Sequence, residues 1–249
     1  MAVLIFFALH WYLSLFSQTF FLHRYAAHRM FTMSKFWEKF FHIFTWITQG
    51  SSYISPHAYG VLHRLHHAHA DTEHDPHSPK YSTNAMTLMM KTKRIYSDIY
   101  YNKADVDPKH LRELPEWLSF SAFAEANAVR VAWGMIYIAF YYFFATHWAM
   151  WLLLPIHFLM GPFHGVVINW FAHKYGYINF KVFDTSKNFL PFDFLMMGES
   201  YHNNHHSLQN RANFGVRWFE IDPTYLVIMA LDKLRIIRLR PHAEASVRL

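Results

Sequence analysis

Two copies of the pattern His-x-x-His-His are the residues in this chain best suited to chemistry. On an α-helix, side chains three and four residues apart lie on one face, so each copy presents three imidazoles to the same side. Neutral imidazole binds transition metals, whereas a solvated helix face would normally carry Lys or Glu. We therefore predict that both copies bind metal. The six histidines are His63, His66, His67, His202, His205 and His206.

A looser pair, His23 and His28, lies near the N-terminus. Five residues correspond to about 140° around an ideal α-helix, so these two rings cannot share a face unless the helix ends or bends between them. The spacing therefore allows them to serve different metal ions. With this pair, eight histidines fall into three clusters.

The number and type of these ligands limit the metal site. The chain has no cysteine, which excludes disulfides, iron–sulfur clusters and thiolate ligands, so any metal is held by nitrogen and oxygen. Eight histidines exceed the four ligands of one tetrahedral zinc, which indicates two metal ions. The paired Glu-x-x-His motifs of soluble di-iron bundles are absent from the sequence, so the site is predicted to be rich in histidine.

The composition places this site beside a membrane. Of the 249 residues, 53% are hydrophobic, 20% are aromatic and only 16% are charged. The mean hydropathy of 0.00 argues against a chain that is embedded throughout. The net charge of +6 comes from Lys and Arg beside the ends of apolar runs, as in cytoplasmic flanks of membrane proteins. No nucleic-acid-binding module is present in the sequence, so nucleic acid is not an expected partner.

We predict an all-α fold, an integral membrane helical bundle with about three transmembrane spans, interfacial helices and a cytosolic helical cap that holds a dinuclear metal site. The spans are expected at about 2–22, 129–146 and 149–172, the last two as a hairpin that turns near His147 and Trp148. Pro155, Gly161, Pro162 and Gly165 should kink the last span. The cap comprises 23–127 and 173–249, so all three histidine clusters lie on one side of the membrane within a single domain, 1–249.

Two segments are predicted to lie on the membrane surface. Residues Phe36 to Ile47 form an aromatic-rich candidate, and Tyr225 to Leu231 is an amphipathic helix that runs into Lys233, Arg235, Arg238 and Arg240. The polar part from Asp71 to Glu125 is expected to be cytosolic, partly helical and partly irregular.

The order of these motifs resembles that of the membrane fatty acyl desaturases of the stearoyl-CoA desaturase kind. The three histidine boxes of that family read His-Arg-x-x-x-His, His-x-x-His-His and His-x-x-His-His, and here they are 23–28, 63–67 and 202–206. The segment Asp71-Thr72 followed by Asp75-Pro76-His77 is similar to the one after the second box of the family. Two further segments, 198–201 before the third box and 169–176, also resemble family motifs.

This resemblance implies a chemistry and a ligand set that spacing alone does not give. It implies two iron ions with nine histidine ligands, His173 being the ninth, and Asn169 reaching one iron through water. It also implies O₂ as co-substrate, a fatty acyl thioester, most simply acyl-CoA with delta-nine-like specificity, and a separate electron donor of the ferredoxin or cytochrome type. Lys91, Lys93 and Arg94 are candidates for contacts with the CoA phosphates, although a basic flank on the cytoplasmic side explains them equally well.

Other residues receive supporting roles. Asp71, Asp75 and Glu199 lie beside the boxes, where carboxylates accept the second N–H of ligating imidazoles, or else act as solvated acids or helix caps. Phe7 and Trp11 are candidates for the end of an acyl tunnel, against the alternative of core packing. His69, His74 and His77 are expected beside the ligands or at the surface. Six single histidines are expected to be surface or core residues: His10, His42, His110, His147, His157 and His242.

One departure from the family and two rival functions remain. The family usually has two spans before the first box, and this chain shows one, which would leave the N-terminus outside the cytosol. A membrane hydroxylase or oxygenase would use the same boxes, and a histidine-rich metal transporter would want ligands at mid-membrane. The expected location is a prokaryotic inner membrane, with the metal site facing the cytoplasm.

Overall fold

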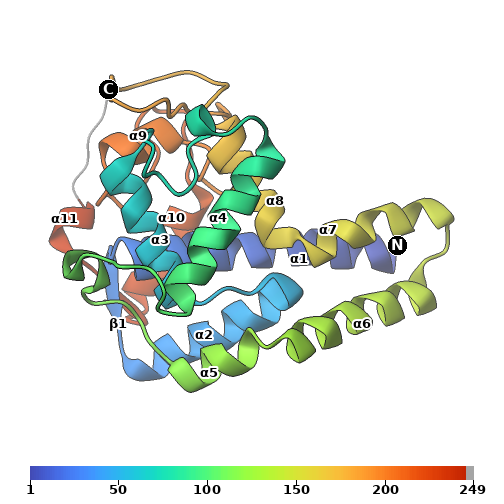
Figure 1. The fold of residues 1–249 in the computed structure, drawn as a ribbon. Helices are drawn as coiled ribbons and strands as arrows, with labels where there is room; N and C mark the ends of the chain where they lie inside the picture. The colour runs from blue at the N-terminus through green and yellow to red at the C-terminus, as the bar shows by residue number, and fades with distance from the viewer. Residues whose placement is uncertain (245–249) are drawn as a thin grey trace.

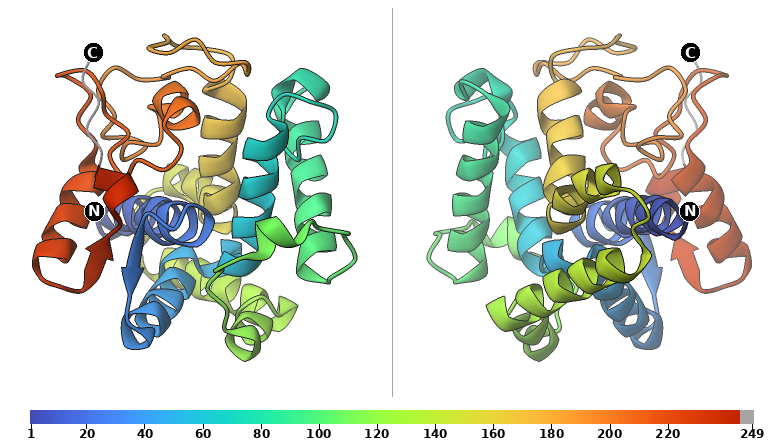
Figure 2. Two further views of the ribbon diagram at one scale, coloured as in Figure 1. Left: turned by 90° about the vertical axis from the view of Figure 1, so that its left-hand side faces the viewer. Right: turned by 90° about the vertical axis from the view of Figure 1, so that its right-hand side faces the viewer.

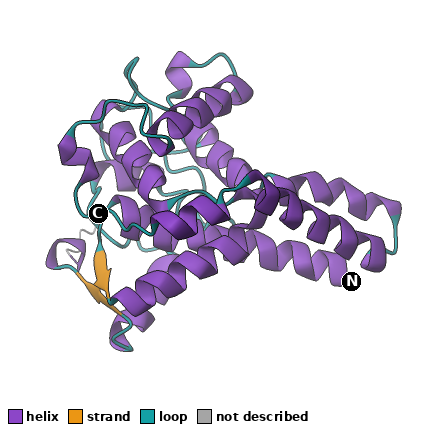
Figure 3. Cartoon of the chain, turned by 60° about the horizontal axis from the view of Figure 1, so that its bottom comes forward, coloured by secondary structure: helices purple, strands orange, loops and turns teal. Residues whose placement is uncertain are grey.

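The computed structural model describes residues 1–244, and helices make up most of them (Figure 3). The order of the longer helices is α1 (Ala2–Phe16), α2 (Lys35–Gln49), α3 (Pro56–His69), α4 (Ala85–Tyr100), α5 (Leu118–Ala124), α6 (Asn127–Phe144), α7 (Leu154–Phe158), α8 (Met160–Val166), α9 (His202–Ser207), α10 (Pro223–Lys233) and α11 (Pro241–Glu244). Two π-helices, η1 (Ser17–Ala27) and η6 (Val167–Phe171), continue α1 and α8. Short 3₁₀ turns are η2 (Gly50–Ser52), η3 (Pro79–Tyr81), η4 (Pro108–Leu111) and η5 (Trp148–Leu153).

The helices divide into an arm and a cap. In Figure 1, α1, α6 and α7 extend side by side to form the arm, with the N-terminus near its far end, and α3, α4, α9 and α10 gather in the cap at the other end. Within the cap, α3 packs against both η1 and α4 (Figure 2). The arm has its own core around Val3, Tyr137 and Tyr141, and a larger core around Phe20, Phe31 and Phe214 lies beneath α10 and the sheet.

The first predicted span is one continuous helix. Among the described residues, Ala2–Ala27, 26 residues long, is the single unbroken helix with the length and apolar character needed to cross a membrane. It extends past the predicted end at residue 22 because the π-helix η1 continues it to the first histidine box.

The second apolar region forms the predicted hairpin, but its return helix is broken. α6 runs out along the arm and α7 returns, and the two halves Trp148–Phe158 and Met160–Phe171 meet at 77°. Pro162 explains the break, because its ring has no N–H to donate to the carbonyl of Phe158, which accepts a hydrogen bond from Ser51 Oγ at 3.2 Å instead. The prediction of a kinked helix is therefore confirmed. α6 does not reach the same combination of length and apolar character as Ala2–Ala27.

The two predicted surface helices are present with different ends. α2 begins at the N-cap Ser34 and exposes Phe36, Phe40, Ile43 and Ile47 along one face. α10 exposes Leu226 and Met229, but it ends at Lys233. The sequence analysis predicted that Arg238 continues this helix. In the structure Arg238 lies in the strand β2 (Ile237–Leu239), which pairs antiparallel with β1 (Phe31–Met33). This two-stranded sheet is the one departure from an all-α fold within the described part of the chain.

Candidate metal centre

The second histidine box lies in the last two turns of α3. Ser55 caps this helix by accepting a hydrogen bond from the N–H of Ala58, and Pro56 occupies its first turn, where no N–H is needed. The predicted helical face is confirmed, but its three rings divide between two groups. His63 and His67 belong to one group, and His66 belongs to the other.

The first box lies at the end of η1, and its geometry corrects an expectation from the sequence. On an ideal α-helix His23 and His28 would point to different sides, and the sequence therefore allowed them to serve different ions. In the π-helix the backbone N–H of His28 bonds to the carbonyl of His23 at 3.1 Å, a contact between residues five apart. This wider turn brings both rings to the same side, with centroids 5.0 Å apart, so both belong to one group.

The third box lies on a short helix, α9, whose two asparagines form hydrogen bonds with neighbouring segments. Asn204 Nδ2 donates to the carbonyl of Phe214 at 2.8 Å and to Glu220 Oε2 at 2.9 Å. Asn203 Oδ1 accepts the backbone N–H groups of Asn179 and Phe180 at 2.8 and 2.9 Å. These bonds fix a helix of six residues that has too few turns to be stable alone.

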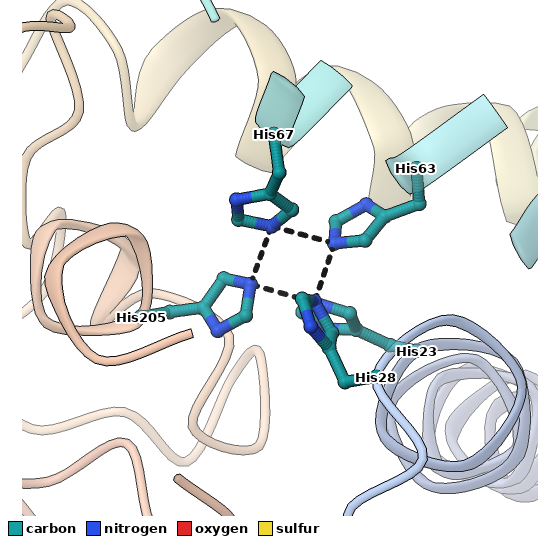
Figure 4. A group of neighbouring side chains, drawn as sticks. All are labelled: His23, His28, His63, His67 and His205. Atoms are coloured by element: carbon teal, nitrogen blue, oxygen red, sulfur yellow. Dashed lines mark hydrogen bonds between the residues drawn. The ribbon is translucent and has the colours of Figure 1, made fainter. Parts of the chain in front are cut away.

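Five imidazoles from the three boxes form the first group, which we call the five-histidine group: His23, His28, His63, His67 and His205. Their Nε2 atoms point toward one another (Figure 4). The Nε2–Nε2 distances are 2.9 Å for His28 and His63, 2.9 Å for His63 and His67, 2.9 Å for His67 and His205, and 3.0 Å for His205 and His23.

Four further imidazoles form the second group, which we call the four-histidine group: His66, His173, His202 and His206. The Nε2 atoms of His66 and His206 are 3.2 Å apart, and those of His173 and His202 are 3.0 Å apart. His173 follows the end of η6, where the chain turns back toward α9. All four residues are buried.

These distances fit metal coordination. With metal–nitrogen bonds of about 2.1 Å, two nitrogens at right angles lie about 3.0 Å apart, and two at a tetrahedral angle lie about 3.4 Å apart. The observed 2.9–3.0 Å in the five-histidine group corresponds to right angles, and five nitrogens exceed a tetrahedral zinc site. Both features favour a metal with more than four ligands.

The hydrogen bonds of the Nδ1 atoms, which point away from the centre of each group, also favour a bound metal ion. His66 Nδ1 lies 2.9 Å from Asp75 and His206 Nδ1 lies 2.8 Å from Asp184, so both rings carry their proton on Nδ1. Their Nε2 atoms are then two acceptors that face each other, which is unfavourable unless a cation lies between them. Burial lowers the pKa of His206 well below its ordinary value, which disfavours a proton on its Nε2 at neutral pH. The residues therefore fit a transition metal ion.

Two of the three carboxylates predicted beside the boxes contact a ligand directly. Glu199 accepts from His23 Nδ1 at 2.7 Å, and Asp75 accepts from His66 Nδ1 at 2.9 Å. Burial by itself raises the pKa of Glu199, but the neighbouring His23 and Arg24 outweigh it, so the pKa is lowered and the carboxylate stays charged. Arg24 is fully buried and also pairs with Asp222 at 2.7 Å.

Asp71, the third predicted carboxylate, does not contact a histidine of the two groups directly but is linked to His173 through Thr185. It accepts the backbone N–H of Thr185 at 2.6 Å, and Thr185 Oγ1 lies 3.2 Å from His173 Nδ1. The preceding residue, Asp184, was missed by the sequence analysis although it binds His206 directly. It lies in an irregular segment 22 residues before His206, and no local spacing links the two.

The predicted substrate residues lie outside both groups. Lys91 Nζ donates to the backbone carbonyls of Asp75 and Glu73 at 2.8 and 3.4 Å, so it holds the loop after the second box. Lys93 and Arg94 line a shallow hollow on α4. The indole of Trp11 donates to the carbonyl of Leu195 at 3.1 Å, which ties α1 to the cap, and the ring of Phe7 is tilted by 34° against that of Trp11 with the centroids 6.3 Å apart. Roles for these residues in substrate binding remain predictions.

The other predicted residues are placed as follows. Asn169 lies in η6, and its link to iron through water remains a prediction. His77 is buried with its ring centroid 4.1 Å from that of His66, whereas His74 is exposed. The single histidines divide between core and surface as expected. His10, His42, His110 and His157 are buried, and His147 and His242 are exposed.

The nine imidazoles in two adjacent groups form a histidine-rich candidate site for two metal ions. Residues 1–237 match the fatty acid desaturase family, so the chain belongs to this family. It is 29% identical over 222 residues to an sn-1 stearoyl-lipid 9-desaturase of Synechocystis sp., which covers 87% of this chain and 64% of that protein. It is 28% identical over 234 residues to an acyl-CoA 5-desaturase of Anemone leveillei, covering 88% of this chain and 65% of that protein. The chain thus spans just under two thirds of the length of these two relatives.

Proposed function

We propose that this protein is an oxygen-dependent fatty acyl desaturase with two iron ions, one in each histidine group. The observation that carries the proposal is the convergence of nine imidazole Nε2 atoms from three boxes and His173 into two groups with metal-like spacing. More than four nitrogens in one group favour iron over tetrahedral zinc, and the absence of cysteine leaves no thiolate ligand in the chain.

The proposed reaction converts one –CH₂–CH₂– unit of a saturated acyl chain, with O₂, two electrons and two protons, into a cis –CH=CH– unit and two molecules of water. When bound, the two irons would supply the reduction of O₂ and the removal of hydrogen. The protein holds three of the nine imidazoles in the tautomer that leaves Nε2 free, because Glu199, Asp75 and Asp184 accept the Nδ1–H of His23, His66 and His206. Seven of the nine histidines are buried, which limits the access of bulk water to most of the site.

We propose an acyl thioester, most simply acyl-CoA, as the substrate. Lys93 and Arg94 offer two cations beside the hollow on α4, where phosphate groups would be attracted. The names of the relatives include a stearoyl-lipid desaturase and an acyl-CoA desaturase, and a hex-5-enoyl-[acyl-carrier protein] acetylenase of Moorena producens is 26% identical over 252 residues, or 91% of this chain and 73% of that protein. An acyl-lipid or carrier-protein substrate is therefore the alternative that an assay must compare.

The proposed setting is a membrane, with the arm in the bilayer and the cap in the cytoplasm of a prokaryotic cell. The apolar helix Ala2–Ala27 and the bent pair 148–171 supply spans, and α6 completes the predicted bundle of three. The nine histidines lie at the cap end of these helices, not halfway along the arm, which favours an enzyme over a transporter. Electrons would come from a separate carrier of the ferredoxin or cytochrome type.

Expression in a host that makes saturated acyl chains, followed by gas chromatography of its lipids, tests this function. A desaturase yields a new unsaturated chain, a hydroxylase with the same boxes yields a hydroxylated chain, and a transporter changes neither. We expect His66→Ala to abolish the new product and to lower the bound iron, because it removes a ligand of the four-histidine group. His242→Ala, at an exposed histidine, is the control that should change neither quantity. Double-bond formation that survives in His66→Ala would refute the ligand assignment.

A further inference from the structure

Four arginines and one glutamate lie close together at the surface of the cap. Glu113 Oε2 lies 2.7 Å from Arg240 Nη2 and 3.7 Å from Arg29 Nε. Arg64 donates to the carbonyl of Arg112 at 2.6 Å, which places these two residues side by side. We call these five residues the arginine surface. Arg112 and Glu113 are exposed, and the other three are partly exposed.

The arginine surface keeps an excess of positive charge. The four guanidinium groups outnumber the single carboxylate of Glu113, which pairs with Arg240 and Arg29, so the five side chains together carry a net charge of +3. The nearest other acids on this loop already have partners, since Asp107 pairs with Lys109 at 3.1 Å and Glu116 lies 3.7 Å from His57. The field of such a patch attracts an acidic macromolecule over a distance of about one Debye length, roughly 8 Å in physiological salt.

This surface adjoins the ligands of the five-histidine group. Arg29 follows His28 in the chain, and Arg64 follows His63. The Nε atom of Arg64 donates to the carbonyl of Ala27 at 2.7 Å, which ties α3 to the end of η1. The arginine surface and the ligands therefore share the same two short backbone segments.

The five-histidine group is also the one that approaches the solvent. His28 and His67 are partly exposed, whereas every member of the four-histidine group is buried. A protein docked on the arginine surface would therefore be next to the accessible edge of the dinuclear site. The four-histidine group has no comparable edge among the described residues.

The donors of the arginine surface suit a protein better than a small anion. Arg64 uses its guanidinium on the carbonyls of Ala27, His110 and Arg112, and Arg240 uses one nitrogen on Glu113. Arg29 stacks on the ring of Tyr25 at 4.6 Å. Arg29 and Arg240 share Glu113, and Arg64 is engaged by backbone carbonyls, so these donors already have partners and do not form a free converging phosphate site.

We propose that the arginine surface docks an acidic one-electron carrier protein that reduces the metal site through the five-histidine group. The inference rests on the proposed function, because desaturation requires two external electrons for each double bond. Two reduced carriers would each be oxidised by one electron. These two electrons, with two more from the acyl chain, reduce O₂ to two molecules of water, and the two acyl hydrogens and two protons complete the balance.

Binding of two acidic carriers tests the proposal directly. The iron-loaded, full-length protein is reconstituted in nanodiscs, and the Kd for a [2Fe–2S] ferredoxin and for an acidic b-type cytochrome is measured at several salt concentrations. We expect salt-sensitive binding of at least one carrier, and we expect Arg112→Glu to weaken it about tenfold and to reduce its dependence on salt. Lys181→Glu makes the same change of charge at another exposed position of the cap and is the matched control.

A chemical reductant separates this inference from the proposed function. When dithionite reduces the protein before a single turnover, Arg112→Glu should form as much product as the unmodified chain, whereas turnover driven by the carrier should fall. If the unmodified chain forms no double bond with dithionite, the proposed function fails while the binding result still stands. Equal effects of Arg112→Glu and Lys181→Glu, or absence of salt-sensitive binding by both carriers, would overturn the docking proposal. Arg112→Gln, which only removes the charge, should give an intermediate Kd and guards against misfolding of the reversed variant.

Discussion

Glu199 Oε2 lies 2.7 Å from Nδ1 of His23, a contact between residues 176 apart in the sequence. It joins the loop before the third box to the ligand at the end of η1. Because the Nδ1–H of His23 is directed to this carboxylate, Nε2 is left as an acceptor that faces the five-histidine group. One hydrogen bond therefore fixes both the tautomer of a ligand and the distance between two boxes.

We expect Glu199→Gln to lower the metal affinity about 10- to 100-fold, because a neutral amide fixes the ring less firmly and makes it less basic. Bound iron, measured by mass spectrometry after dialysis against a chelator, should fall while the helix content stays unchanged. Glu113→Gln, at an exposed carboxylate of the cap, should leave the iron content as it is. An unchanged affinity in Glu199→Gln would show that this contact is structural only.

Asp184 offers a test that is specific for the second group. Its carboxylate lies 2.8 Å from His206 Nδ1, and the four-histidine group has only three other histidines. We expect Asp184→Asn to reduce the bound iron from about two ions toward one, with a weakening of about 10- to 100-fold at the affected ion. Mössbauer spectra should then lose one of two iron environments.

Asp105→Asn is the matched control for this variant, since Asp105 is exposed and lies outside both groups. It should keep both iron environments. Loss of both irons at once in Asp184→Asn would contradict the assignment of His206 to one group alone.

The ligands could be predicted from local spacing where the backbone is regular. The His-x-x-His-His boxes on α3 and α9 needed only the periodicity of an α-helix. The joint orientation of His23 and His28 could not be predicted in this way, because it depends on the π-helical turn of η1. Asp184 could not be found because the segment around it has no periodic structure and its partner is fixed by tertiary contacts.

The fold also has some parts that the local sequence predicts and others that depend on tertiary contacts. The apolar runs predicted the arm, and Pro162 predicted the break in its return helix. β1 and β2, which have three residues each, pair so that Phe31 lies opposite Leu239. Such short strands carry too few residues for an alternating pattern, so their pairing depends on the core beneath them.

The buried ion pair of Arg24 with Asp222 should matter for stability. Arg24 Nη2 lies 2.7 Å from Asp222 Oδ2 and both side chains are fully buried. We expect Arg24→Met to destabilise the protein by about 3–5 kcal/mol, because it leaves two carboxylates, Asp222 and Glu199, without their cation. The midpoint of chemical unfolding in detergent, followed by circular dichroism, measures this loss.

Arg240→Met is the control for this change, since Arg240 pairs with the exposed Glu113. A surface pair of this kind contributes about 0–1 kcal/mol. A loss in Arg24→Met that is no larger than the loss in Arg240→Met would contradict a stabilising role for the buried pair.

The stability of the metal-free protein should fall when the pH is lowered from 7.5 to 5.5. Burial lowers the pKa of several ligands well below the ordinary value of about 6.5, among them His63, His202 and His205. Below pH 6.5 the unfolded chain binds protons that the folded chain does not, so the free energy of unfolding decreases as the pH falls. Burial raises the pKa of Asp193 to about 6 and also raises the pKa values of Glu125 and Asp222, which acts in the opposite direction at acidic pH, but the histidines with a lowered pKa are more numerous. Thermal unfolding of chelator-treated protein at both pH values checks the sign.

Iron-loaded protein, in which the same nitrogens are occupied, should show a smaller shift of stability at first and should then release iron as protons compete for the imidazoles. A metal-free protein that is equally stable at both pH values would show that these histidines are not held neutral by burial.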